Sequence, residues 1–269
     1  MKKTIRELVR DYPAAFILLL GLVMRSLFLI FYYSSPDWSQ LLVDSLFHQR
    51  WAEAIAAGDV WGKDPFFRAP FYIYLLGLLY SIFGHSILVA RIFGALCGLT
   101  AVYFTYGIAL KVFSKRTAVA AGILHAMYPI AIYFESEILV EGLFTVFLEA
   151  SIFVFLISLE RKNGRFYFLS GLLLGFAAIT RPLALALAPV FLIYAIWRGA
   201  IIRKGTSGAI LFFVALFLPI IPVTLRNVIV GDDLVLISSS GGINFYIGNN
   251  ATADGYSASM PPLMETTGA

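Results

Sequence analysis

Residues 71–83, FYIYLLGLLYSIF, decide how this chain is threaded through a membrane. The run is strongly apolar, but it is shorter than the about 20 apolar residues that a helix needs to cross a bilayer. We therefore expect it to lie at the membrane surface as an interfacial or re-entrant helix. The side of the membrane on which every later loop falls depends on this assignment.

The composition is that of an integral membrane protein. Of the 269 residues, 60% are hydrophobic and 13% are charged, and the mean hydropathy is +0.85. This apolar share is far above that of a soluble domain. The net charge of +4 comes from basic residues between apolar runs, where Lys and Arg act as topological anchors, so no nucleic-acid partner is expected. The single cysteine, Cys97, excludes a disulfide framework within the chain.

Seven further apolar runs are candidates for spans: 14–33, 87–113, 117–134, 138–159, 166–179, 183–197 and 207–225. If residues 71–83 do not span, the Lys and Arg clusters between these runs all fall on one side, as the positive-inside rule requires. The sequence thus predicts an all-α integral membrane fold with seven transmembrane helices and a cytoplasmic N-terminus. The loop 34–86 then lies on the opposite, extracytoplasmic side.

The chain is expected to divide near residue 226. Residues 1–226 form the predicted transmembrane module, with 34–86 as its helical first outer loop. Residues 227–269 form the start of an extracytoplasmic segment that is cut short. In this segment β-branched residues alternate with turn residues, which predicts a short strand or two and a loop rich in Gly and Asn.

The outer side carries most of the unusual polar residues. Residues 39–57 are good helix formers, and helical spacing places Asp44 and His48 on one face. Arg68, Arg181, Arg226 and Asn227 fall on the same side of the membrane. A carboxylate can take a proton from a hydroxyl, and a guanidinium binds phosphate in a fork geometry. The same charges would also suit interfacial anchors and solvated loops.

Residues 43–84, VDSLFHQRWAEAIAAGDVWGKDPFFRAPFYIYLLGLLYSIFG, resemble the first outer loop of GT-C membrane glycosyltransferases of the protein mannosyltransferase and aminoarabinose transferase type, glycosyltransferase family 39. Residues 224–255, TLRNVIVGDDLVLISSSGGINFYIGNNATADG, are similar to a bacterial branch of that superfamily. The segments ESEIL at 135–139 and TRP at 180–182 follow the same order. The resemblance implies an N-terminal portion of a GT-C enzyme in a bacterial inner membrane.

The resemblance implies transfer of a sugar from a polyprenyl-phosphate-linked donor to an acceptor hydroxyl of a protein, lipid or polysaccharide, with inversion. Asp44 matches the loop aspartate that acts as general base, and Arg68 matches a basic residue for the donor phosphate. Glu137 matches an acidic residue that assists catalysis, with Glu141 as the alternative one turn further on. Glu135 is expected to be solvated.

Five further residues are candidate substrate-binding groups: His48, Arg181, Arg226, Asn244 and Asn249. Arginines at a span boundary also serve as anchors, and asparagines among glycines also form turns. A divalent cation between Asp44 and Glu137 is compatible with the resemblance but is not required by it. The three histidines are scattered along the sequence and predict no zinc cluster.

Two other functions are compatible with a polar outer face. A non-catalytic membrane protein that binds or carries a lipid-linked sugar would keep the fold and the donor site without transfer. A secondary transporter would show related halves with broken helices, and the sequence has no such internal symmetry. The sequence also has no P-loop or GxGxxG pattern, which favours a lipid-borne donor over a nucleotide sugar.

Overall fold

The computed structural model describes residues 11–197, 206–250 and 253–256, and these residues form helices and connecting loops without a β-strand. The elements in chain order are α2 (Pro13–Tyr33), η1 (Pro36–Trp38), α3 (Val43–Ala56), α4 (Phe71–Phe83), α5 (Ile87–Val112), α6 (Lys115–Met127), α7 (Pro129–Ser136), α8 (Glu141–Arg161), α9 (Gly164–Ala178), η2 (Pro182–Ala186), α10 (Leu187–Trp197), α11 (Thr206–Gly231) and α12 (Ser240–Asn249).

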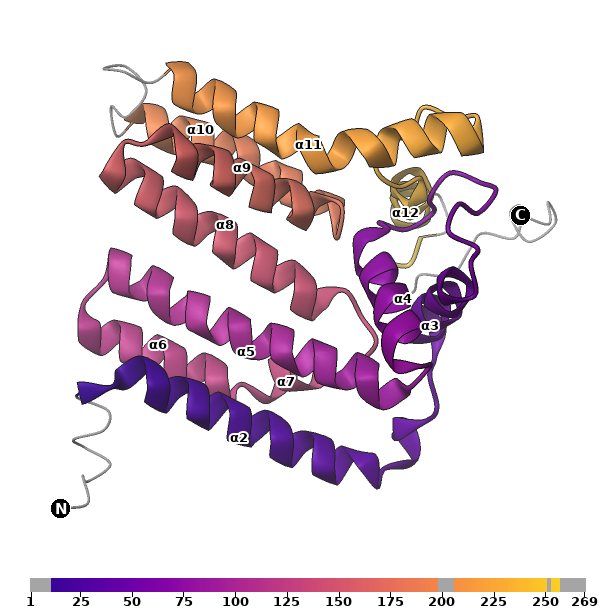
Figure 1. The fold of residues 1–269 in the computed structure, drawn as a ribbon, viewed down its shortest axis with the longest axis horizontal. Helices are drawn as coiled ribbons and strands as arrows, with labels where there is room; N and C mark the ends of the chain where they lie inside the picture. Colours follow the sequence, from indigo (N-terminus) through magenta and orange to yellow (C-terminus); the bar gives the residue numbers. More distant parts are fainter. Residues whose placement is uncertain (1–10, 198–205, 251–252, 257–269) are drawn as a thin grey trace.

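The long helices lie side by side in one bundle, and the short helices α3, α4 and α12 gather at one end of it (Figure 1). The turns between α5 and α6 and between α8 and α9 lie at the other end, and they carry basic residues such as Lys115 and Arg161. The bundle therefore separates a basic end from an end with short helices and long loops, as the charge pattern predicts.

Four helices are long and apolar enough to cross a membrane, namely α2, α5, α8 and the described part of α11 from Gly208. The consecutive helices α6 and α7, bent by 51° at their junction, pass the same test as one broken span, which makes five. The other two predicted spans correspond to α9 and to η2 with α10, which are shorter apolar helices that run along the same bundle (Figure 1). The chain is an integral membrane protein, and the count of seven spans stays a prediction.

The segment 71–83 forms α4, which packs against α3 beyond the end of the long helices (Figure 1). Ala52 and Ile55 of α3 are buried together with Ile73 and Leu76 of α4. The backbone N–H of Phe71 donates to the carbonyl of Ile179 at 3.1 Å, which fastens the start of α4 to the end of α9. The short apolar run is thus half of a helical cap on the bundle.

The predicted C-terminal strands are wrong for the residues that the structure describes. Helix α11 continues through Val228 to Gly231, and 240–249 is helix α12. Between the two helices, the backbone N–H groups of Ser239 and Ser240 donate to the carbonyls of Phe66 and Phe67 at 2.9 and 3.1 Å. The β-branched pattern was misleading because two strands alone are marginally stable, and the described residues show just these two backbone hydrogen bonds between the segment and the loop before α4. Residues 251–252 and 257–269 of the predicted C-terminal segment lie outside the described residues.

Candidate active site

A cavity of about 500 Å³ opens at the end of the bundle that carries α3 and α4. Five segments that are far apart in the sequence line it: the start of α3, the loop before α4, the turn before α8, the turn after α9, and the start of α12. The predicted site residues that line the cavity are Asp44, His48, Arg68, Arg181 and Asn244. The fold therefore brings together most of the polar groups that the sequence singled out.

Asp44 and Arg68 form a two-point ion pair on one wall of the cavity. The two terminal nitrogens of Arg68 lie 2.7 and 2.9 Å from the two carboxylate oxygens of Asp44. Asp44 lies in the first turn of α3, where the positive end of the helix dipole favours a carboxylate. The guanidinium also lies near the rings of Phe47 and Phe67, at 5.6 and 6.0 Å. This arrangement holds the carboxylate in one orientation toward the cavity.

A second ion pair joins two other segments of the lining. Arg181, in the turn after α9, lies 3.2 Å from Glu141, the first residue of α8. The Arg181 side chain is 47% exposed, so its guanidinium keeps free faces toward the cavity. The sequence left the second acidic residue open between Glu137 and Glu141, and the structure places Glu141 in the cavity lining.

His48 is buried in the wall beside Asp44. Its Nδ1 lies 2.9 Å from the carbonyl oxygen of Ile138, so Nδ1 carries a proton and Nε2 remains an acceptor in the neutral ring. Burial lowers the pKa of His48 below its usual value, although the bond to Ile138 acts in the opposite direction. The ring therefore presents itself as a neutral imidazole at neutral pH.

Glu137 lies outside the cavity lining, in a cluster of its own. Its Oε1 lies 3.0 Å from a terminal nitrogen of Arg91 and accepts from the hydroxyl of Tyr32 at 2.7 Å. Arg91 is 0% exposed, and its guanidinium lies over the rings of Tyr32 and Trp38 at 4.6 and 4.7 Å. The cluster fastens the ends of α2, α5 and α7 to the start of the outer loop.

Arg226 and Asn249, two other predicted residues, also lie outside the cavity lining. Arg226 is buried on α11, where it donates to the backbone carbonyls of Trp61 and Asp64 and lies over the ring of Phe66 at 4.1 Å. Asn249 donates to a carbonyl within α12 and is exposed to solvent. Arg226 therefore secures the loop that carries Arg68 and does not face the cavity.

Asn227, next to Arg226, is a loop anchor that the sequence placed on the outer side without predicting a role for it. Its side chain accepts from the backbone N–H of Phe66 at 2.9 Å and donates to the carbonyls of Val235 and Ile237 at 3.0 and 3.2 Å. Because the side chain is fully buried, one amide joins the two loops that frame the cavity.

An apolar groove of about 280 Å³ lies beside the polar cavity. Its lining includes Tyr74 of α4, Ile179 at the end of α9 and Pro222 of α11. The groove and the cavity are adjacent, because residues next to each other in the sequence line the two. Ala69 and Thr180 line the cavity, whereas their neighbours Pro70 and Ile179 line the groove. The end of the bundle thus offers a polar and an apolar compartment next to each other.

The structure corrects the expectation that Glu135 is solvated. Its side chain is 7% exposed and lies 2.7 Å from Arg25 inside the bundle. The error arose because Glu135 lies two residues from Glu137 near a predicted loop, although α7 extends to Ser136. Within the part of the chain that the structure describes, no three His, Cys, Asp or Glu side chains gather in a way that could hold a metal ion.

A family model described as dolichyl-phosphate-mannose-protein mannosyltransferase matches residues 67–225, more than half of the chain. The match covers Arg68, Glu141 and Arg181, whereas Asp44 and Asn244 lie outside it. In two other comparisons, no curated protein and no solved structure matches.

Proposed function

The chain belongs to the dolichyl-phosphate-mannose-protein mannosyltransferase family of membrane glycosyltransferases, and from this premise we propose that it transfers a sugar from a polyprenyl-phosphate-linked donor to an acceptor hydroxyl on the extracytoplasmic face. The observation that carries this proposal is the polar cavity with an oriented carboxylate, Asp44, and an exposed arginine, Arg181, beside an apolar groove. Its volume is in the range of small-molecule sites.

Asp44 is the proposed general base. In the reaction, a carboxylate oxygen takes the proton of the acceptor hydroxyl while the hydroxyl oxygen attacks the anomeric carbon of the donor sugar. The bond between the anomeric carbon and the phosphate oxygen breaks, and its electron pair leaves with the polyprenyl phosphate. One displacement of this kind inverts the anomeric configuration and needs no covalent enzyme intermediate.

Two arginines are proposed to bind the donor phosphate. A guanidinium has five N–H donors, and the contact with Asp44 uses two of those of Arg68. Arg68 can therefore orient the base and still reach an anion in the cavity. Arg181 is more exposed and has one close carboxylate partner, Glu141, so it is the better placed to take up negative charge as the phosphate leaves.

The remaining lining residues supply hydrogen bonds for hydroxyl groups. Glu141 is proposed to take the role that the resemblance gives to Glu137, because it lines the cavity and has an oxygen without a hydrogen-bond partner. The Nε2 atom of His48 and the amide of Asn244 are suited to sugar or acceptor hydroxyls. The apolar groove between α4 and α11 is the proposed seat of the first isoprene units of the donor.

A stereochemical transfer assay tests this function. The purified chain is incubated with a polyprenyl-phosphate sugar and a hydroxyl acceptor, and the anomeric configuration of the product is read by NMR. We expect an inverted product, and we expect Arg181→Gln to raise the KM for the donor about 10-fold or more through loss of one charged hydrogen bond. Donor binding without any transfer would indicate a carrier instead, and a retained configuration would exclude the single displacement.

A further inference from the structure

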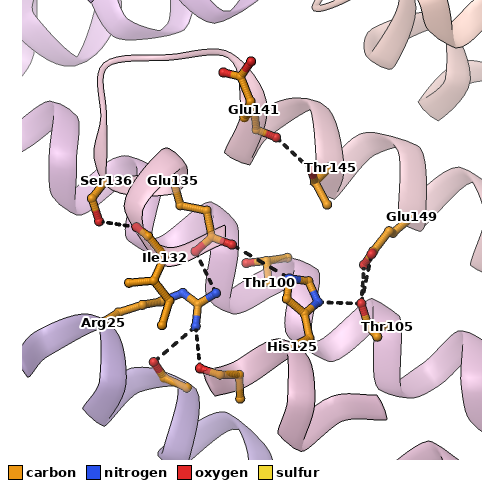
Figure 2. A network of polar contacts seen from close by, with 12 residues as sticks. Arg25, Thr100, Thr105, His125, Ile132, Glu135, Ser136, Glu141, Thr145 and Glu149 are labelled. Carbon is orange, nitrogen blue, oxygen red and sulfur yellow. Dashed lines mark hydrogen bonds and ion pairs between the residues drawn. The ribbon is translucent and has the colours of Figure 1, made fainter. Parts of the chain in front are cut away.

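A chain of polar side chains that do not line the cavity crosses the interior of the bundle (Figure 2). It contains Arg25 of α2, Thr105 of α5, His125 of α6, Glu135 of α7 and Glu149 of α8. Each of these helices is one of the spans or part of the bent pair. Ionisable groups at such depth are costly in a membrane and generally serve a purpose, and the glycosyl transfer described above uses none of them.

Glu135 occupies a slot that is built for it. Its carboxylate lies 2.7 Å from Arg25, and the two side chains are 7% and 2% exposed. On the other side, a Cβ atom at Gly98 of α5 would lie 1.9 Å from the carboxylate, and one at Gly94 would lie 1.8 Å from the Glu135 carbonyl. The helix α5 can hold α7 at this distance only because both positions are glycine.

His125 continues the chain from Glu135 to Glu149. Its Nε2 lies 3.8 Å from Glu135 Oε1, and its Nδ1 lies 2.7 Å from the hydroxyl oxygen of Thr105. That hydroxyl lies 2.9 and 3.0 Å from the two carboxylate oxygens of Glu149. Figure 2 shows these contacts as one continuous line of partners from Arg25 to Glu149.

Counting protons along this line gives two consistent arrangements. In the first, the Nδ1–H of a charged His125 donates to Thr105, whose O–H donates to an ionised Glu149. In the second, a neutral Glu149 donates to Thr105, whose O–H donates to Nδ1 of a neutral His125, and Nε2–H faces Glu135. Each arrangement gives the Thr105 hydroxyl one hydrogen bond as a donor and one as an acceptor, and in each the network has a net charge of zero once the charges of Arg25 and Glu135 are included.

The two arrangements hold the same number of protons. If one proton is removed, so that Glu149 is ionised and His125 is neutral, the network carries one excess negative charge, which the interior of a membrane protein disfavours strongly. The two arrangements interconvert when the Nδ1–H proton passes to the Thr105 oxygen and the Thr105 proton passes to Glu149. We propose that the network binds one proton, which His125 and Glu149 share through the hydroxyl of Thr105, and that this proton stabilises the 51° bend between α6 and α7.

The position of the network supports this effect on the bend. His125 lies near the end of α6 and Glu135 near the end of α7, and in both arrangements the Nε2–H of His125 faces Glu135, so the bound proton favours contact between the two halves of the broken span. The other titratable groups that the packed helices bring close are Cys97, which interacts with Glu135, and Tyr106, which packs between α2 and α6. The proton site does not depend on the proposed transfer reaction.

Histidine NMR of the full chain in detergent micelles tests the proposal, because only three histidines are present and His125→Gln assigns the signal. The imidazole ¹⁵N shifts are followed against pH in the wild type and in four variants. We expect Glu149→Gln to lower the titration midpoint of His125 by about one pH unit or more, a tenfold loss of proton affinity. Thr105→Val should lower it as well, whereas Thr105→Ser should keep it.

Thr100→Val is the matched control, because Thr100 lies on the same helix and, among the residues that the structure describes, its hydroxyl donates to the carbonyl of Leu96 and not to the network. The melting temperature gives a second readout. The proposal requires the folded state to bind the proton more tightly than the unfolded state does, so stability should fall as the pH rises through the midpoint in the wild type and should change less in Glu149→Gln. The proposal is overturned if Glu149→Gln leaves the His125 midpoint in place, or if Thr105→Val behaves like Thr100→Val.

Discussion

Replacing Glu137 by Gln tests whether this acid has a structural or a catalytic role. Glu137 is the only close carboxylate partner that the described residues give to Arg91, and it is 11% exposed. The substitution keeps an oxygen that can accept from Tyr32, but it removes the anion that balances a fully buried guanidinium. We therefore expect a large loss of stability and, in the protein that remains folded, near-normal transfer.

The size of the effect follows from the environment of Arg91. Removal of one partner from a buried ion pair costs about 3–5 kcal/mol. Arg91 keeps hydrogen bonds to the carbonyls of Ser136 and Trp38 at 2.9 and 3.0 Å and its two aromatic contacts, so the expected cost is smaller, about 2–3 kcal/mol. For a chain of this size, that corresponds to a fall in melting temperature of about 4–12 °C.

The assay compares Glu137→Gln with Glu141→Gln. Melting is followed by tryptophan fluorescence in detergent, and transfer is measured per folded molecule after size-exclusion chromatography. Glu141→Gln should melt near the wild-type temperature because its ion pair with Arg181 is partly exposed, yet it should lose most of its transfer. A Glu137→Gln protein that melts like the wild type and has lost transfer about 100-fold would refute the structural role and restore Glu137 to catalysis.

Three further predictions follow from single contacts. Arg68→Lys should lower kcat/KM about fivefold, because a lysine loses the second hydrogen bond to Asp44, worth about 1 kcal/mol at this partly exposed pair. An unchanged kcat/KM would show that the two-point contact of Arg68 does not orient Asp44. Burial lowers the pKa of His48, so the folded state resists protonation of the ring, and the melting temperature of the wild type should fall as the pH drops below about 6.5. In His48→Gln the melting temperature should depend less on pH in this acidic range, and the same pH dependence in both proteins would contradict a buried neutral ring. Gly98→Ala should destabilise the fold strongly, because the added Cβ would collide with the Glu135 carboxylate. Gly242→Ala is the control because the space at its Cβ position is open, and equal melting temperatures for the two variants would contradict the close packing of Glu135 against α5.

Five of the eight candidate site residues from the sequence line one cavity, and they could be singled out because polar residues stand out against an apolar chain. Asp44, His48, Arg68, Arg181 and Asn244 come from four separate stretches, and all five line one cavity. The short run 71–83 also forms one helix, α4, that is separate from the long apolar helices, as its length predicts. These features depend on local chemistry and on the length of apolar runs, which a sequence shows directly.

The choice between Glu137 and Glu141 depended on where α8 begins, and the sequence does not show this. The segment from Ile138 to Val140 is apolar and suits either a helix or a turn, and the structure shows that α8 begins only at Glu141. The partners Arg25 and Glu135 are equally hidden, because they come from helices far apart in the sequence. Tertiary pairing decides such cases, and neither periodicity nor residue type reveals it.

The transfer rate of Asp44→Asn in a single turnover tests the central claim most directly. Asparagine keeps the size of the side chain but cannot accept the proton of the acceptor hydroxyl, so the rate should fall about 10²- to 10⁴-fold with donor binding retained. The control is Glu53→Gln, an acid on the same helix that contacts Gln49 and His85 outside the cavity lining, and it should transfer at the wild-type rate. A rate for Asp44→Asn within a few-fold of the wild type would contradict the assignment of Asp44 as the base.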